Sequence, residues 1–292
     1  MQVYDKNLND NKTRESQLKS LFKFDSVDKK CKEEFLKIPI DLPWKELEKD
    51  IELAFEKFGW YGMCHRANSD WNRSEIYGGL GLTYNPTYKF NMSYHAHTYG
   101  QPRSSQNAED PKVWLESLDR KSYSEFENTP LIRGKDTYDD CLGFRNPTDV
   151  TKFRSFKHIF EKLNFTPIQG RIAQIKAADY GDHPNKDFIW HRDEKPDTVT
   201  RMLIPLVYSD DYYIEFKDTG TRFYFEPGYA YHWNTYDQIH RWSFDYHKNI
   251  INRTCIVLGF TPWLDYDNGI WTTNKYFNKM HPTDMVNQRL VM

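Results

Sequence analysis

The sequence lacks several features that would place it in a familiar class. None of its four cysteines forms a Cys-x-x-Cys pair, so the spacing typical of a closed structural zinc site is missing. No stretch approaches eighteen consecutive apolar residues, and residues 1–20 contain no apolar run like that of a signal peptide. We therefore expect a cytoplasmic protein, in a reducing setting that keeps thiols reduced, with no membrane partner.

An excess of charge of one sign is also missing. The 292 residues carry a formal net charge of −2, and no long basic stripe is present, so bulk attraction to nucleic acid or to an anionic membrane is not expected. Aromatic residues make up 16% of the chain. Without a basic groove beside them, they indicate strands and core rather than platforms for stacked bases. The length is ample for one large core, and the sequence does not indicate an oligomeric state.

The first part of the chain is predicted to flank that core. Residues 1–40 are rich in Lys, Asp and Asn and predict a polar N-terminal arm. Apolar residues then recur at helical spacing from Trp44 to Phe58, which predicts an amphipathic helix ending at Gly59. The glycines of residues 78–82 precede no Lys-Ser/Thr helix start, so they favour a turn or bulge before a strand over a phosphate loop.

The segment before the core combines a loop and a helix. Residues 100–147 are polar and show little periodicity, which is typical of a lid or a substrate-side loop. A second helix is predicted after Thr148 or Asp149, either of which suits its N-cap, with an apolar face that reaches Leu163. We expect residues 41–166 to form a helical and loop-rich region that contributes a lid or a substrate pocket.

The pattern changes to short strands after Pro167. Turn residues separate eight runs at near-regular intervals, which indicates a sandwich or jelly roll rather than a parallel sheet. The runs are residues 171–177, 188–193, 200–208, 212–217, 221–225, 229–234, 239–244 and 251–260. Residues 167–265 are thus the expected core, and residues 266–292 a C-terminal extension.

One set of residues within this core suits a metal. His191 and Asp193 are two residues apart and would point to the same side of a strand, and His240 follows after about fifty residues, enough for several short strands to bring it back. Two imidazoles and one carboxylate leave the opposite positions of the metal open, as in non-haem Fe(II) oxygenases. His95 and His97 are also two apart, but no carboxylate completes that set. The sequence predicts an Fe(II) site at His191, Asp193 and His240.

With an arginine added, the order of these residues resembles the 2-oxoglutarate and Fe(II)-dependent oxygenase superfamily. That superfamily carries H-x-D on an early core strand, a distal His on a late strand and an Arg on the last one, matched here by His191, Asp193, His240 and Arg253. The resemblance covers about residues 167–263. It implies a mainly β fold with flanking helices around a double-stranded β-helix, a jelly-roll or cupin-like core. It also implies 2-oxoglutarate and O2 as cosubstrates, with ascorbate supporting activity.

Within the superfamily the chain is most similar to the aspartyl/asparaginyl β-hydroxylase-like branch. That branch places an Arg and, two residues later, a His on the strand after the first metal ligand; this chain has Arg201 but Leu203 in the place of the His. Several members of the branch also lack the metal carboxylate, whereas Asp193 is present here. Its presence favours hydroxylation over halogenation, because the related halogenases replace that carboxylate.

The spacing of the distal histidine departs from the family. Arg253 follows His240 by thirteen positions, where the family's Arg follows its distal His by about ten. His232 and His247 are the alternative distal ligands, although both fit the spacing less well. A longer hairpin around residues 244–248 would accommodate the extra residues.

The remaining candidates surround the bound oxoacid. Arg253 shares its strand phase with Cys255 and Val257, and a buried Arg is costly unless it meets an anion; the distal carboxylate of 2-oxoglutarate and a structural salt bridge are both open. Arg201 would bind the other end of the cosubstrate, bind the substrate carboxylate or form an ordinary ion pair. Further hydrogen-bonding candidates are Asn234, Tyr180 and Gln174.

Three functions follow from these residues. The first is a dioxygenase that hydroxylates a C–H bond of a small molecule or amino acid and releases succinate and CO2. The second is a peptide Asp/Asn β-hydroxylase. The third is a jelly-roll protein that binds a ligand or metal without turnover. The sequence does not choose the substrate.

Overall fold

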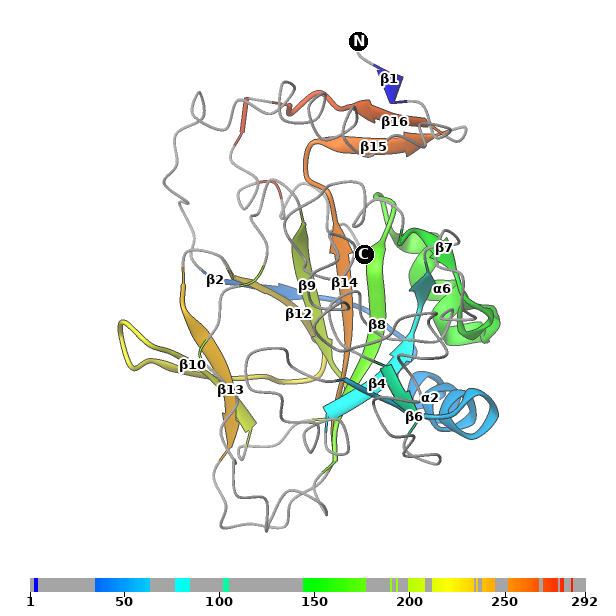
Figure 1. The fold of residues 1–292 in the computed structure, drawn as a ribbon, viewed down its shortest axis with the longest axis vertical. Helices are drawn as coiled ribbons and strands as arrows, with labels where there is room; N and C mark the ends of the chain where they lie inside the picture. The colour runs from blue at the N-terminus through cyan, green and yellow to red at the C-terminus, as the bar shows by residue number, and fades with distance from the viewer. Residues whose placement is uncertain are drawn as a thin grey trace, which may run out of the picture.

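The computed structural model describes residues 3–4, 35–63, 77–84, 102–104, 144–176, 190, 193, 199–207, 212–233, 235, 238–244, 252–267, 270–277, 279–280 and 285. These residues form antiparallel sheets with two α-helices packed beside them (Figure 1). The predicted mainly β class with flanking helices is thereby confirmed. None of the described helices is long and apolar enough to cross a membrane.

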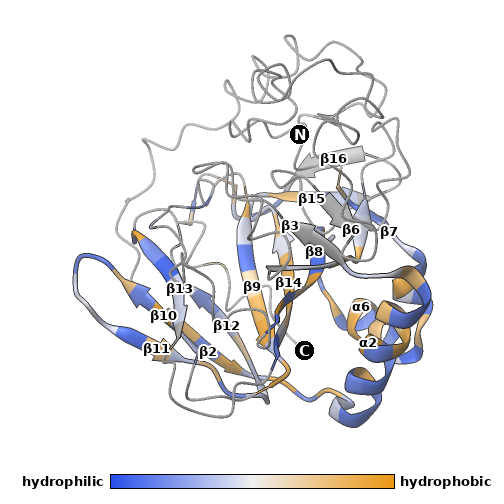
Figure 2. Ribbon diagram, turned by 60° about the horizontal axis from the view of Figure 1, so that its bottom comes forward, coloured by the Kyte–Doolittle hydropathy of each residue, from blue (hydrophilic) through white to orange (hydrophobic). Residues whose placement is uncertain are grey.

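The largest sheet has eight strands and places β14 near its centre. Its order is β2 (Phe35–Pro39), β12 (Tyr229–Trp233), β9 (Thr200–Pro205), β14 (Arg253–Phe260), β8 (Ile168–Ile175), β4 (Tyr77–Gly81), β3 (Tyr61–Met63) and β6 (Pro102–Ser104). Every residue of β14 is buried, because β9 and β8 flank it and both of its faces are covered. Figure 2 shows the hydrophobic colouring along this centre.

A three-stranded sheet faces one side of the large sheet. It consists of β11 (Arg222–Tyr224), β10 (Tyr212–Phe216) and β13 (His240–Phe244). We call the apolar residues between the two sheets the inter-sheet cluster. Its buried members are Ala173, Ile175, Leu203, Tyr212, Ile214, Phe216, Phe225, Tyr231, Trp233, Cys255 and Val257. On β8 and β14 these members alternate with residues of the opposite face, as the pleat of a strand requires.

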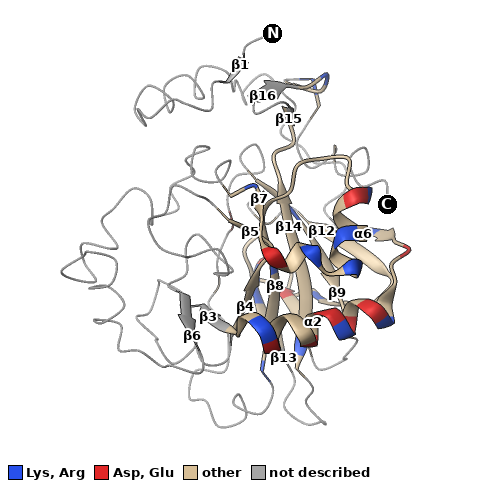
Figure 3. Ribbon diagram, turned by 90° about the vertical axis from the view of Figure 1, so that its right-hand side faces the viewer, with Lys and Arg blue, Asp and Glu red and all other residues tan. Residues whose placement is uncertain are grey.

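The opposite face of the large sheet packs against the helices α2 (Trp44–Phe58) and α6 (Arg154–Lys162). Charged residues occupy their outer surfaces (Figure 3), while Leu47 and Phe156 pack into the core with Ile256. The Ser155 N–H and hydroxyl both donate to Oδ2 of Asp50, at 2.9 and 2.7 Å, and so join the two helices.

Smaller sheets complete the described part. β5 (Thr83–Tyr84) pairs with β7 (Asn146–Pro147), and β1 (Val3–Tyr4), β16 (Ile270–Thr273) and β15 (Leu264–Asp267) form a three-stranded sheet. The last of these sheets crosses the predicted core boundary at residue 265.

Most of the predicted elements are confirmed. The first helix spans Trp44–Phe58, with Gly59 at its C-cap as predicted. The second is interrupted, because a 3-10 helix (Asp149–Lys152) is followed by an extended Phe153 before α6 begins. Seven of the eight predicted strands are present. The eighth, residues 188–193, lies outside the described residues except for Trp190 and Asp193, which are not in a strand.

Two flanking segments differ from expectation. Residues Phe35–Pro39, which we placed in the polar arm, form β2 and pair with β12 along the large sheet; their apolar alternation is short and lies beside charged residues. The glycines at 78–82, predicted to precede a strand, belong largely to β4 itself. Gly79 has φ +154°, and a Cβ there would collide with the Ile172 carbonyl, so this strand requires glycine.

Candidate metal centre

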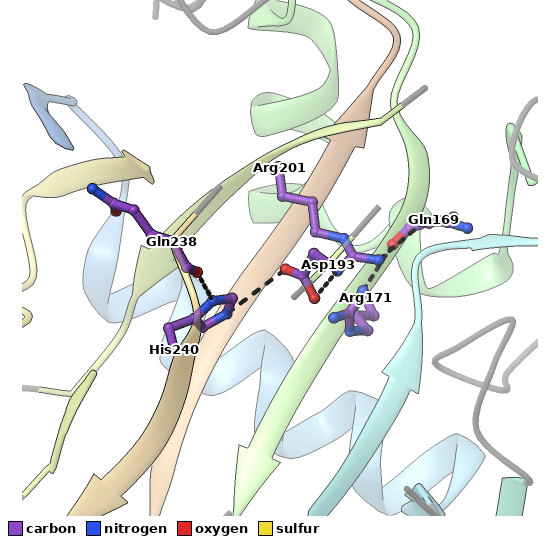
Figure 4. A network of polar contacts seen from close by, with 6 residues as sticks. All are labelled: Gln169, Arg171, Asp193, Arg201, Gln238 and His240. Carbon is purple, nitrogen blue, oxygen red and sulfur yellow. Dashed lines mark hydrogen bonds and ion pairs between the residues drawn. The ribbon is translucent and has the colours of Figure 1, made fainter. Parts of the chain in front are cut away.

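Asp193 and His240 meet in the space between the two sheets. His240 is the first residue of β13, and its Nε2 atom lies 4.0 Å from Oδ2 of Asp193 (Figure 4). The His240 side chain is 2% exposed and that of Asp193 is 18% exposed. The structure therefore brings together two of the three predicted metal ligands, and the third, His191, lies outside the described residues.

Contacts around the His240 ring fix its tautomer. Its Nδ1 atom lies 3.0 Å from the carbonyl oxygen of Gln238, which can only accept, so Nδ1 carries the proton and the lone pair is on Nε2. The rings of Phe216 and Trp233 hold the imidazole from two sides, with centroids 6.4 and 5.9 Å away. Metal-binding histidines are usually oriented in this way, by a hydrogen bond from the ring nitrogen that does not bind the metal.

Contacts around Asp193 fix its carboxylate in the same way. Its backbone N–H donates to the Thr235 carbonyl at 3.0 Å, and Nη1 of Arg201 donates to Oδ1 at 2.9 Å. Arg201 also reaches Oε1 of Gln169 at 3.5 Å. Of the alternatives for Arg201, the ion pair is the one that the structure contains, and its partner is the predicted metal ligand.

This donor set fits a metal ion. A carboxylate oxygen and an imidazole lone pair that face each other across 4.0 Å are stabilised by a proton or a cation between them, and both are ligands that suit Fe(II). Within the described residues no group of three His, Cys, Asp or Glu side chains gathers, which agrees with the position of His191 outside them.

The alternative distal histidine His232 does not meet Asp193. Its strand neighbours Tyr231 and Trp233 belong to the inter-sheet cluster, so the alternation of β12 turns His232 to the opposite face. Its Nδ1 atom donates to the backbone carbonyl of Arg201 at 2.8 Å. The other alternative, His247, lies outside the described residues.

Arg253 is a buried cation on the same inward face. It is the first residue of β14, is 6% exposed, and its Cζ atom lies 3.2 Å from the centroid of the Trp242 ring. Its Nη2 atom donates to Sγ of Cys255 at 3.4 Å, a weak acceptor. In the described part of the chain no carboxylate contacts this guanidinium, so the structural salt bridge weighed for Arg253 does not form there.

The other hydrogen-bonding candidates lie elsewhere. Gln174 points to the face opposite the inter-sheet cluster, where its Nε2 donates to Oγ1 of Thr254 at 3.0 Å, so the structure does not bring it to the metal pair. Asn234 and Tyr180 lie outside the described residues.

Sequence reasoning missed Gln169 and Arg171. Both are buried on β8, and Gln169 links Arg201 to Arg171 (Figure 4). A signal was available, because Arg171 interrupts an apolar strand in phase with Ala173, just as Arg253 does on β14. The inward turn of Gln169 left no trace in the sequence pattern.

No protein-family model and no curated protein matches the chain. Among solved structures, it is similar to the dioxygenase for auxin oxidation 1 from Arabidopsis thaliana in its 2-oxoglutarate complex, with 13% identity over 78% of this chain and 82% of that one, and a TM-score of 0.32. It is also similar to a full-length Neurospora crassa protein in complex with α-ketoglutarate, with 10% identity over 88% of this chain and 86% of that one, and a TM-score of 0.35. Likenesses at these scores establish neither fold nor reaction, so the proposed function rests on the geometry of the site.

Proposed function

We propose that the chain is a 2-oxoglutarate- and Fe(II)-dependent dioxygenase that hydroxylates a C–H bond of a small molecule or amino acid. The observation that carries the proposal is the pairing of Asp193 with His240 on the same inward side as a buried Arg253 that has no carboxylate partner in the described residues. A divalent cation satisfies the first pair, and an anionic cosubstrate satisfies the arginine. The two facing antiparallel sheets support a double-stranded β-helix core.

Each residue has a defined part in this proposal. His191, Asp193 and His240 hold Fe(II). When bound, Fe(II) would allow O2 to react with 2-oxoglutarate. One oxygen atom of O2 would be inserted into the substrate C–H bond and the other would enter succinate, with release of CO2. Arg253 binds the distal carboxylate of 2-oxoglutarate through its guanidinium fork, and the Trp242 ring holds that fork in place.

The contacts of the ligands prepare them for the metal. The Gln238 carbonyl keeps the proton on Nδ1 of His240, so Nε2 is available. Arg201 contacts Oδ1 of Asp193, while Oδ2 is the oxygen that faces His240, so Oδ2 is the carboxylate atom placed to bind the metal. The His240 ring is buried against Phe216 and Trp233 of the inter-sheet cluster, and this apolar setting strengthens its electrostatic contacts.

Succinate formation from 2-oxoglutarate tests the proposal. Purified protein is assayed with Fe(II) and ascorbate, with and without a pool of amino acids, and His240→Ala serves as background. His158→Ala, on α6 and outside the site, is the matched control. We expect succinate from the wild type and from the control only. A wild-type chain that neither forms succinate nor binds 2-oxoglutarate contradicts the proposal and favours the non-catalytic jelly-roll function.

A further inference from the structure

Arg171 is a buried guanidinium that the proposed reaction does not use. It is 6% exposed, and its Nε atom is buried without a hydrogen-bond partner among the described residues. Its Nη1 atom donates a long hydrogen bond, 3.4 Å, to the backbone oxygen of Gln169. No carboxylate contacts it in the part of the chain that the structure describes. A buried cation in this state carries a desolvation cost that an anionic ligand would offset.

The strand register separates Arg171 from Arg253. On the large sheet Val257 pairs with Arg171, and Arg253 pairs with Ile175. The two arginines are therefore offset by four residue positions, about 13 Å along the extended strands. Both face the inter-sheet space, since Ala173 and Cys255 in the same phase belong to its cluster. The guanidinium groups of Arg171 and Arg253 therefore lie toward different ends of the inter-sheet space.

Gln169 ties Arg171 to the metal pair. Its side-chain oxygen accepts from Arg201 at 3.5 Å, and its backbone oxygen accepts from Arg171 at 3.4 Å. Arg201 in turn pairs with Asp193, so Figure 4 shows one continuous network from His240 to Arg171. Arg171 thus belongs to the metal end of the inter-sheet space.

The backbone of Gln169 is strained in a way that serves this network. Its φ of +52° is the one positive φ of a non-glycine residue in the described chain, and it falls where the register of β8 and β14 shifts between Val257 and Gly259. Bulges of this kind re-aim groups next to active sites, and strained backbone persists where the surroundings over-determine it. Here the distortion turns both oxygens of Gln169 to the two arginines.

The charge balance specifies the missing ligand. Arg201 is matched by the Asp193 carboxylate, whereas Arg171 adds a further positive charge to the network. A singly charged, planar anion matches one guanidinium in both charge and shape, which describes a carboxylate. A phosphate monoester carries nearly two charges at neutral pH and exceeds this balance.

We propose that Arg171 binds the carboxylate of the substrate, so that the substrate class is a carboxylic acid held beside the metal pair and away from Arg253. That the bound carboxylate belongs to a substrate rests on the proposed function, whereas the existence of a carboxylate site at Arg171 does not. Free amino acids belong to this class, and esters or amides of the same compounds do not.

Thermal unfolding of the full-length, metal-free protein tests the site independently of turnover. Acetate, sulfate and phosphate are titrated at matched ionic strength against chloride, in the Arg253→Met background so that Arg253 contributes nothing. We expect acetate to raise the unfolding midpoint of Arg253→Met, and this rise to be lost in the Arg171→Met/Arg253→Met variant. An equal rise in both variants overturns the site. A rise with sulfate or phosphate but not with acetate overturns the carboxylate class.

Binding of 2-oxoglutarate with Mn(II) separates the two proposals. We expect Arg253→Met to weaken this binding by at least about tenfold, and Arg171→Met to change it by less than about twofold. Loss in Arg171→Met alone makes Arg171 the cosubstrate residue and overturns its assignment to substrate. If the wild type binds no 2-oxoglutarate while acetate still depends on Arg171, the proposed function fails and the carboxylate site stands.

The variants themselves also distinguish a binding role from a structural one. Arg171→Met replaces an uncompensated buried charge with an apolar side chain of similar length, so its unfolding midpoint without added anion is expected to be no lower than that of the wild type. A lower midpoint indicates a structural arginine and contradicts the inference. Arg171→Lys keeps the charge without the fork, and we expect it to retain part of the acetate response.

Discussion

The Nε2 atom of His240 and the Oδ2 atom of Asp193 face each other at 4.0 Å between the two sheets of the protein. Their other polar atoms are already bound, since Arg201 contacts Oδ1 of Asp193 and the Gln238 carbonyl contacts Nδ1 of His240. Nε2 of His240 and Oδ2 of Asp193 therefore point toward one place. A cation at that place would bind to both side chains.

His240→Ala should weaken divalent metal binding by at least about 100-fold, because a direct ligand contributes no less than the outer groups that orient it. Titration with Mn(II) or Co(II), followed by calorimetry, measures the change. His158→Ala on α6 is the control, and its affinity should equal that of the wild type. An unchanged affinity in His240→Ala would remove this residue from the metal site.

Asp193 should also stabilise the metal-free protein, because it neutralises Arg201, whose side chain is 10% exposed. Asp193→Ala leaves that guanidinium buried without this partner and should cost about 3 to 5 kcal/mol of unfolding free energy. Replacing both residues, as Asp193→Ala/Arg201→Met, should recover most of the loss. Urea unfolding of the metal-free variants measures it, and a double variant no more stable than the single one would argue against charge as the cause.

Arg253→Met should raise the dissociation constant of 2-oxoglutarate by about 10- to 100-fold, the range expected for losing a hydrogen bond to a charged group. Trp242→Leu should have a smaller effect in the same direction, because it removes only the ring on which the guanidinium rests at 3.2 Å. The exposed Arg154 on α6, changed to Met, is the control. Equal affinity in Arg253→Met and the control would refute the assigned role.

The sequence predicted the parts of this molecule that depend on local pattern. Period-two alternation and turn residues located β9, β10 and β13 within a few residues, and helical spacing located α2 with Gly59 at its end. α2 buries one face, which its helical spacing reveals, whereas β9 and β10 are buried at nearly every residue and are found as short apolar runs between turn residues. The proximity of Asp193 to His240 was expected from the ordered metal-site pattern and the family resemblance rather than from a local period, and Asp193 itself is not in a strand.

The parts that depend on tertiary contacts could not be predicted. β2 pairs with β12 across almost two hundred residues, and no local signal records such a pairing. Gln169 adopts a positive φ only because the bulge between β8 and β14 imposes it. The ion pair between Arg201 and Asp193 likewise could be found only from the fold. The sequence left open whether Arg201 binds the cosubstrate, the substrate or an ion-pair partner.

Gly259→Ala should disturb the bulge that shapes Gln169. A Cβ at this position would lie 2.6 Å from the Ile168 carbonyl oxygen and 3.0 Å from Cγ1 of Val199, and a backbone atom cannot yield as a side chain can. We expect a loss of about 1 to 3 kcal/mol of unfolding free energy. Because Ile168 precedes Gln169, the contact to Arg201 should weaken as well, which lowers metal affinity.

Gly170→Ala on β8 is the matched control for that change. Its Cβ would meet side-chain atoms, the nearest being Cδ2 of Leu258 at 3.2 Å, which can move by a few tenths of an ångström. Chemical denaturation and Mn(II) titration of both variants should separate them. A Gly259→Ala variant as stable as Gly170→Ala would show that the bulge is not constrained at this position.

Arg241 should position the segment that carries His191. Arg241 directly follows His240, its Cζ atom lies 4.4 Å from the ring centroid of Trp190, and Trp190 directly precedes His191. The Nε and Nη2 atoms of Arg241 both bind Oε2 of Glu215, at 2.9 and 2.7 Å, so its guanidinium is held in place under the ring. This stack joins the two segments that supply the predicted histidine ligands.

Arg241→Met should therefore lower Mn(II) affinity by about 10- to 100-fold, although Arg241 binds no metal. Arg222→Met is the matched control, because Arg222 also contacts Glu215, at 3.7 Å, but stacks on Tyr213 and not on Trp190. Calorimetric Mn(II) titration, with unfolding midpoints recorded for both variants, separates positioning from stability. Equal Mn(II) affinities in the two variants would mean that the Trp190 stack does not place His191, because the loss of the Glu215 contact is common to both.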